Sequence, residues 1–201
     1  LGGCLGEDCK VVFGYDFVNN DDDPIDDHGH GTHVAATVAG ISSRYLGVAP
    51  GAKIAAYKVL SAGGSGDIIG IARAVEASVC GRKYNSNIGG EDSYLNGCDG
   101  DYSDRVDVIS MSLGGPGDPD DGLSTLIDRA SSLGVISSIA AGNSGPSEKT
   151  IGSPGTARTA ITVAAACKSD QIGSHPQCSS AEPIADFSSR GPLTWNGEDI
   201  E

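Results

Sequence analysis

KIAAYKVLSAGGSGD, residues 53–67, is the stretch of this chain that decides its fold. Residues 53–60 form a short run with β-rich ends, which predicts a strand. The glycines of residues 63–66 predict a turn, and Asp67 is a residue type that caps helix N-termini. Apolar residues then recur at helical spacing, at Ile68, Ile71, Ala72, Val75 and Val79. The order is therefore strand, turn, helix.

The same order repeats further along the chain. Residues 106–111, 135–140 and 160–165 predict three more strands. Between the first two lies a second helix, closed by Gly134 as a C-cap. Its apolar face is formed by Leu123, Leu126, Ile127, Ala130 and Leu133. Strands that alternate with amphipathic helices indicate an α/β fold with a mostly parallel sheet and helices on both faces.

Two glycine-rich loops follow predicted strands, at the sheet edge where α/β proteins carry their sites. They read SLGGP at residues 112–116 and AGNSGP at residues 141–146. Glycine lets another backbone approach closely, and the Asn143 amide can direct a hydrogen-bond donor into an open site. The alternative is that both loops are ordinary turns, with Asn143 in the left-handed conformation.

A histidine-rich run, DHGHGTHVA at residues 27–35, places His30 where a helix is predicted to begin. A base held there can serve a nucleophile from elsewhere in the fold. The alternative is a zinc or other transition-metal site built from His28, His30, His33 and the preceding aspartates. Packing within the helix is the simpler explanation of His33, and His28 is expected to be a solvated loop residue.

Composition excludes several classes of function. The 201 residues are 38% hydrophobic and suffice for one domain with a sizeable core. Thirteen basic and 27 acidic residues give a net charge of −14, which repels nucleic-acid phosphates. No apolar run is long enough to cross a bilayer, and the first residues lack a signal-peptide pattern.

Six cysteines fall into three local pairs: Cys4 with Cys9, Cys80 with Cys98, and Cys167 with Cys178. Each pair encloses a loop-like segment rich in Gly, Asp, Ser or Pro. Local disulfides formed in an oxidising compartment are the simplest explanation, and they predict a secreted, extracellular protein. Buried free thiols are the alternative, whereas zinc is disfavoured because no C-x-x-C pair occurs.

Three motifs in order carry a family resemblance: HGTHVA at residues 30–35, SMSLGG at 110–115 and AAGNSGP at 140–146. Together they resemble the subtilisin-like serine proteases, the subtilases of peptidase family S8. The segments LGVAP at residues 46–50 and FSSRGP at 187–192 are similar to that family as well. The resemblance implies a subtilisin-like three-layer fold and identifies the chain as the central part of a catalytic domain.

The resemblance implies a role for each matching residue. His30 matches the catalytic histidine, the general base of acyl-enzyme chemistry, and Asn143 matches the side-chain donor of the oxyanion hole. An extended peptide would add between two backbone edges. Small residues beside Asn143 imply a roomy apolar slot for the residue before the scissile bond. The implied substrate-binding residues are Gly64, Ser65, Gly66, Ser112, Leu113, Gly114, Ala140, Ala141 and Gly142.

Two departures from the family pattern stand out. Asp16 lacks the Val-Ile-Asp-Thr-Gly context expected of the catalytic aspartate, and no serine has the Gly-Thr-Ser-Met-Ala context of the nucleophile. By family order, the acid is expected before Leu1 and the serine beyond Glu201. Residues 1–201 are therefore expected to be a single, incomplete catalytic domain, part of a longer serine endopeptidase and inactive alone. The alternative is a non-catalytic, subtilase-like binding module.

The implied partners are polypeptide substrates, together with a propeptide or a proteinaceous inhibitor. The chemistry itself requires no cofactor. The aspartates among residues 21–27 suit either solvation of a loop or a structural calcium ion, because calcium prefers hard oxygen ligands. Neither alternative is assigned, no calcium site is placed, and the metal ligands stay unknown.

Overall fold

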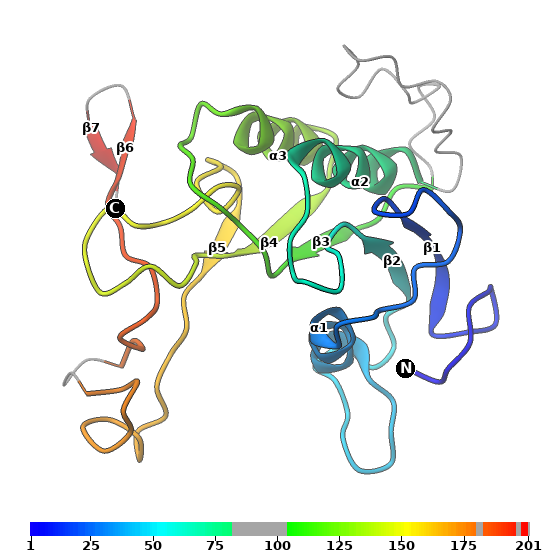
Figure 1. Ribbon diagram of the computed structural model, residues 1–201, viewed down its shortest axis with the longest axis horizontal. Coiled ribbons are helices and arrows are strands. Elements are labelled where there is room, and N and C mark those ends of the chain that lie inside the picture. Colours follow the sequence, from blue (N-terminus) through cyan, green and yellow to red (C-terminus); the bar gives the residue numbers. More distant parts are fainter. Residues whose placement is uncertain (82–103, 180–182, 196–197, 201) are drawn as a thin grey trace. The chain divides into compact units, whose positions relative to one another are not determined.

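The computed structural model describes residues 1–81, 104–179, 183–195 and 198–200. Backbone contacts group the chain into two compact units, Leu1–Val106 and Asp107–Glu201. Each unit has its own parallel sheet (Figure 1). The expectation of a single domain over residues 1–201 stays a prediction.

The first unit alternates strands and helices (Figure 1). Its elements are β1 (Val11–Asp16), α1 (His30–Ala39), β2 (Ile54–Lys58) and α2 (Ile68–Cys80). β1 pairs with β2 in parallel, with Asp16 opposite Lys58. The strand and helix predicted on either side of the 63–66 turn are thus confirmed, whereas β1 is a strand that sequence analysis did not assign.

Helix α2 supplies much of the core of this unit. The Asp67 carboxylate accepts a hydrogen bond from the Gly70 N–H at 2.8 Å, so Asp67 caps the helix as predicted. Ile68, in the first turn of α2, is 65% exposed. The other four apolar positions are buried, namely Ile71, Ala72, Val75 and Val79.

A buried carboxylate ends β1. Asp16 is 1% exposed, accepts hydrogen bonds from the N–H groups of Val18 and Asn19, and forms an ion pair with Lys58 at 3.1 Å. Burial raises the pKa of Asp16, but the hydrogen bonds and the Lys58 charge outweigh burial, and the net pKa is lowered. Lys58 Nζ also lies 2.8 Å from the Asp27 carboxylate. Lys58 therefore ties the end of β1 to the loop that precedes α1.

Helix α1 begins at His30, as predicted, and is capped by a residue that precedes the N-cap position. Gly29 occupies the N-cap position with φ +95°, a conformation that favours glycine, and makes no side-chain cap. Asp26 replaces it: one carboxylate oxygen accepts the N–H groups of His28 and Gly29 at 2.9 and 2.8 Å, and the other accepts the Thr32 N–H at 2.7 Å. Burial raises the pKa of Asp26, but these hydrogen bonds outweigh burial and hold the pKa well below its usual range.

The second unit contains a three-stranded parallel sheet in the order β3-β4-β5. Its strands are β3 (Val108–Met111), β4 (Ile136–Ala140) and β5 (Ile161–Val163), each within the predicted range, and α3 (Gly122–Ser132) lies between the first two. Asp121 caps α3 by accepting the Ser124 N–H at 2.8 Å. An antiparallel pair, β6 (Leu193–Trp195) and β7 (Glu198–Ile200), was not predicted.

Burial alternates along the strands of this sheet. α3 packs on β4 (Figure 1). Leu126 and Ile127 of α3 are buried, as are Ile109 and Ile139 of the sheet. Within the described part of this unit, the other face stays open. Its apolar side chains are 50–58% exposed, namely Val108, Ile136, Ile161 and Val163.

Two of the three predicted disulfides are present, Cys4–Cys9 and Cys167–Cys178. Cys98 lies outside the described residues, so its pairing with Cys80 stays a prediction. None of the helices in the described ranges is long and apolar enough to span a bilayer.

Replacing Asp26 with alanine is expected to lower the free energy of unfolding by about 1–2 kcal/mol at neutral pH, as for a lost N-cap. Because the pKa of Asp26 is lowered on folding, this stabilisation is present above the unfolded pKa of about 4 and is lost as pH falls through the folded value. Urea unfolding across a pH series should show the difference from wild type narrowing toward acid. The exposed Asp22→Ala serves as control, and a pH-independent difference would contradict the capping role.

Two buried serines of the second unit should respond oppositely to alanine. Ser137 is 1% exposed, and its hydroxyl has no hydrogen-bond partner among the described residues. The Ser124 hydroxyl lies 2.8 Å from Thr156 Oγ1 and 3.2 Å from Ser153 Oγ. Thermal unfolding should show Ser137→Ala stabilised by about 1 kcal/mol and Ser124→Ala destabilised by about 1–2 kcal/mol. Destabilisation of both variants by the same amount would refute this difference.

Candidate functional site

A pocket opens where the three parallel strands of the second unit end. Its cavity volume is about 280 Å³, and its wall comes from β3, β4, β5 and the residues that follow each strand. Most of the lining side chains are small or apolar, as suits an uncharged ligand group. The lining residues are Ser110, Met111, Ser112, Ser138, Ile139, Ala140, Gly142, Asn143, Val163, Ala164 and Ala165.

Four of the predicted site residues meet in this pocket: Ser112, Ala140, Gly142 and Asn143. Asn143 is exposed, so its amide can reach a ligand in the pocket. Gly142 has φ +108°, a backbone conformation that carries the chain sharply out of β4 and places Asn143 beyond the strand end. Residues from two loops that lie about 30 residues apart in the sequence therefore meet at the edge where the parallel strands end.

Three predicted site residues of the second unit lie outside that lining. Ala141 is 3% exposed; its N–H donates to the Val163 carbonyl and its carbonyl accepts the Gly152 N–H. A Cβ on Gly114 would lie 2.9 Å from the Ser153 carbonyl oxygen, so the loop passes close to residue 153 there. Leu113 is the third, and the proposed roles of all three in substrate binding stay predictions.

The β5 side of the pocket was not predicted from the sequence. Val163, Ala164 and Ala165 line it, and they end the strand predicted at residues 160–165. Residues at the carboxyl end of a parallel strand are expected at the edge of the sheet that carries the site, so the predicted strand at 160–165 could have identified these residues. These three apolar side chains make the pocket more hydrophobic than the two glycine-rich loops alone indicate.

In the first unit, His30 is exposed at the start of α1. Its ring lies edge-on to His28, with 6.5 Å between ring centroids. A Cβ on Gly64 would lie 3.9 Å from His28 Nε2, so the predicted substrate edge at residues 64–66 approaches the histidine pair. An exposed imidazole held at a fixed helix start can exchange a proton with a bound group.

The predicted edge itself is a closed turn. The Gly64 N–H donates to the Ser61 carbonyl, and the Ser65 carbonyl accepts from both the N–H and the hydroxyl of Ser61. A Cβ on Gly66 would lie 2.0 Å from the Val59 carbonyl oxygen, so only glycine fits this close approach. These contacts fix the backbone of residues 64–66 before any peptide binds.

One expectation about the histidine-rich run changes. His33 is exposed, so the expectation that it packs is wrong. His28 is exposed, as expected. Across the described ranges, no three His, Cys, Asp or Glu side chains are placed to hold a metal ion, and calcium keeps no placed site.

The chain matches known proteins over nearly its whole length. The model of the Subtilase family, Peptidase_S8, matches residues 7–199. Serine protease AprX of Bacillus subtilis (strain 168) is 36% identical over 198 residues, which are 94% of this chain and 40% of AprX. Minor extracellular protease Vpr of the same organism is 41% identical over 162 residues, 76% of this chain and 17% of Vpr.

A solved structure agrees with these relatives. Sphericase superposes with a TM-score of 0.64 at 36% sequence identity, covering 88% of this chain and 51% of Sphericase. The chain thus spans about half or less of the length of the proteins it matches. The agreement confirms the subtilisin-like α/β fold. With a family match that runs from residue 7 to residue 199, this chain belongs to the subtilase family.

Proposed function

We propose that this chain is the part of a secreted serine endopeptidase that supplies the general base, His30, and an oxyanion donor, Asn143. The observation that carries the proposal is the exposed Asn143 amide beside a small, largely apolar pocket at the strand ends. His30, exposed at the start of a capped helix, supports it from the other unit.

The proposed reaction is acyl transfer. A serine hydroxyl oxygen bonds to the carbonyl carbon of the peptide while His30 takes the hydroxyl proton. The carbonyl oxygen becomes negative, and the Asn143 amide donates a hydrogen bond to it. When the C–N bond breaks, His30 returns the proton to the leaving amine. Water then hydrolyses the acyl-enzyme by the same sequence of steps.

Substrate binding would use backbone edges and the pocket. Residues 64–66 and 112–114 are the proposed edges along which an extended peptide adds. The apolar pocket wall, with Ile139, Val163 and Ala165, favours an apolar side chain before the scissile bond. The proposed partners are therefore polypeptides, including a propeptide or a protein inhibitor that binds along the same backbone edges.

Secretion is part of the proposal. Two disulfides are present, and such bonds persist in oxidising compartments. The relative Vpr is named an extracellular protease. A serine nucleophile and a catalytic acid in the family contexts do not occur within residues 1–201, so we propose that this chain alone hydrolyses no peptide. A structural calcium ion stays a proposal without placed ligands.

In the full-length protein that contains this chain, Asn143→Ala is expected to lower kcat about 10²–10³-fold with KM little changed, because the donor acts on the transition state. His30→Ala is expected to reduce hydrolysis further, to residual levels. His175→Ala, a change in the exposed loop of the second unit, is the matched control. Initial rates on a peptide substrate measure all three, and full activity of Asn143→Ala would remove its proposed role.

The isolated chain provides a second test. A fluorophosphonate probe, which labels activated serines, should leave residues 1–201 unlabelled and should label the full-length protein at a serine outside them. Labelling of a serine within this chain would overturn the proposed division of the catalytic residues. A full-length protein that binds peptides but takes up no probe would instead be the non-catalytic binding module.

A further inference from the structure

Segment 187–189 holds the residues on both sides of Asn143. The Ser189 N–H donates to the Gly142 carbonyl at 3.0 Å, and the Ser189 hydroxyl accepts the Ser144 N–H at 3.1 Å. One residue thus binds the residue before Asn143 and the residue after it. The Phe187 carbonyl extends this pairing by accepting the Gly145 N–H at 2.9 Å.

The approach between the two segments is close enough to require glycine. A Cβ on Gly142 would lie 2.9 Å from Ser189 Oγ, and a Cβ on Gly145 would lie 2.0 Å from the Ser188 carbonyl oxygen. Ser188 and Ser189 are 1% and 4% exposed, so water does not compete for these hydrogen bonds. The Asn143 side chain, by contrast, is exposed and lines the pocket.

We propose that Ser189 is a positioning residue that sets the direction of the Asn143 amide. This inference rests on the proposed function, because it takes Asn143 as the oxyanion donor. Such a donor stabilises the transition state only where it points at the developing charge, and a shift of about 1 Å can cost about 10²-fold in rate. Fixing residues 142 and 144 fixes the backbone from which the Asn143 side chain projects.

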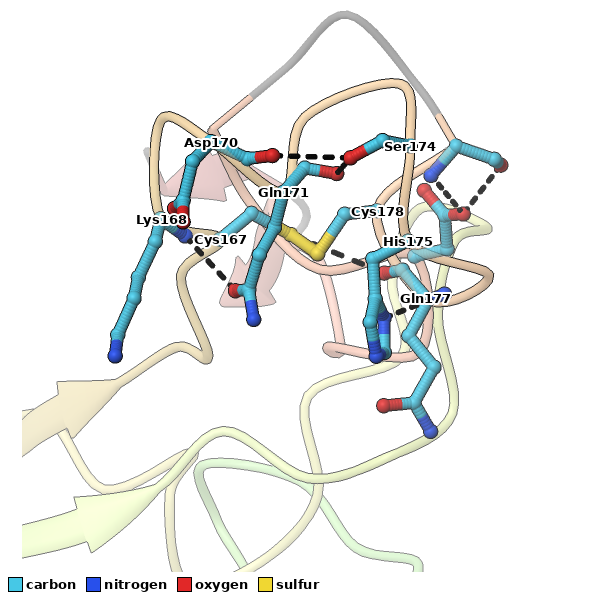
Figure 2. Close-up of a disulfide and its surroundings, with 10 residues drawn as sticks. Cys167, Lys168, Asp170, Gln171, Ser174, His175, Gln177 and Cys178 are labelled. Atoms are coloured by element: carbon cyan, nitrogen blue, oxygen red, sulfur yellow. Dashed lines mark hydrogen bonds between the residues drawn. A yellow bond between two sulfur atoms is a disulfide. The ribbon is translucent and has the colours of Figure 1, made fainter.

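The holding segment is itself anchored by a disulfide-closed loop. Figure 2 shows the bond between Cys167 and Cys178, with the Gln171 side chain turned back to accept the Lys168 N–H. Phe187 packs against the core cluster that contains both cysteines. The segment that contains Ser189 is therefore anchored through Phe187 to the disulfide-bonded cluster.

The chain offers a matched control at the adjacent position. Ser188 is also a buried serine whose hydroxyl accepts one backbone N–H, but that N–H belongs to Ala165 and not to a neighbour of Asn143. Loss of either hydroxyl should destabilise the fold to a similar extent. Only loss of the Ser189 hydroxyl should release the turn that carries the donor.

The test is a double-mutant cycle in the full-length protein. Ser189→Ala is expected to lower kcat about 10- to 100-fold with KM little changed, whereas Ser188→Ala changes kcat less than about threefold. In the Asn143→Ala background, Ser189→Ala should have no further effect on kcat, because the positioned group is gone. A purely structural role would instead give the same loss in both backgrounds, and that result would overturn the inference.

Two measurements separate the possible failures. If Asn143→Ala alone leaves kcat unchanged, the proposed function fails; if it lowers kcat and Ser189→Ala does not, only the positioning role fails. Should Ser189→Ala not fold, Ser189→Cys keeps the side-chain size with a weaker acceptor and is expected to lower kcat in the same way. In NMR spectra of the full-length protein, the Asn143 side-chain amide signals should shift in Ser189→Ala and stay in place in Ser188→Ala.

Discussion

Parallel pairing of β3, β4 and β5 is the constraint on which the candidate site depends. Parallel strands all end at the same edge of the sheet, so the residues that follow each strand come together there although they are far apart in the sequence. The register pairs Met111 with Ile139. Met111 directly precedes Ser112, and Ile139 directly precedes Ala140, the last residue of β4. The pocket is therefore a consequence of strand direction more than of loop sequence.

Loop sequence decides how closely the segments at that edge approach. A Cβ on Gly145 would lie 2.0 Å from a carbonyl oxygen of segment 187–189, and one on Gly117 would lie 2.2 Å from the Asp121 carboxylate. Any larger residue would push the segments apart and lengthen the hydrogen bonds between them. The glycines beside Asn143 thus serve packing between segments, in addition to the open access that sequence analysis assigned to them.

Local patterns predicted the elements of the fold well, because period and caps are local properties. The Asp67 cap, the start of α1 at His30 and the three strands of the second unit all follow from neighbouring residues. β1 was not predicted because residues 11–16 contain a glycine and two aromatic residues, without a clear alternation of apolar and polar side chains. β6 and β7 are three residues each, too short for a periodic signal.

The candidate site was predictable only in part, because its supporting contacts are non-local. Asn143 and Gly142 stand in a recognisable motif, but Ser189 lies about 45 residues further on and meets them only through folding. The aspartate run before α1 has the same limitation. Its composition suited solvation or calcium, whereas in the fold Asp26 accepts three backbone N–H groups and Asp27 pairs with Lys58.

Asp26 and Ser189 perform the same task with different chemistry, and burial explains the difference. Asp26 accepts three backbone N–H groups beside His30, and the Ser189 hydroxyl accepts one beside Asn143. Asp26 is half-buried at a helix start, where the helix dipole and three donors keep its carboxylate charged. Ser189 is 4% exposed, and an uncompensated charge there would carry a large desolvation cost. A neutral hydroxyl avoids that cost. The hydrogen bond from Ser144 to Ser189 beside Asn143 should therefore be independent of pH, whereas the Asp26 hydrogen bonds beside His30 should weaken when the carboxylate is protonated.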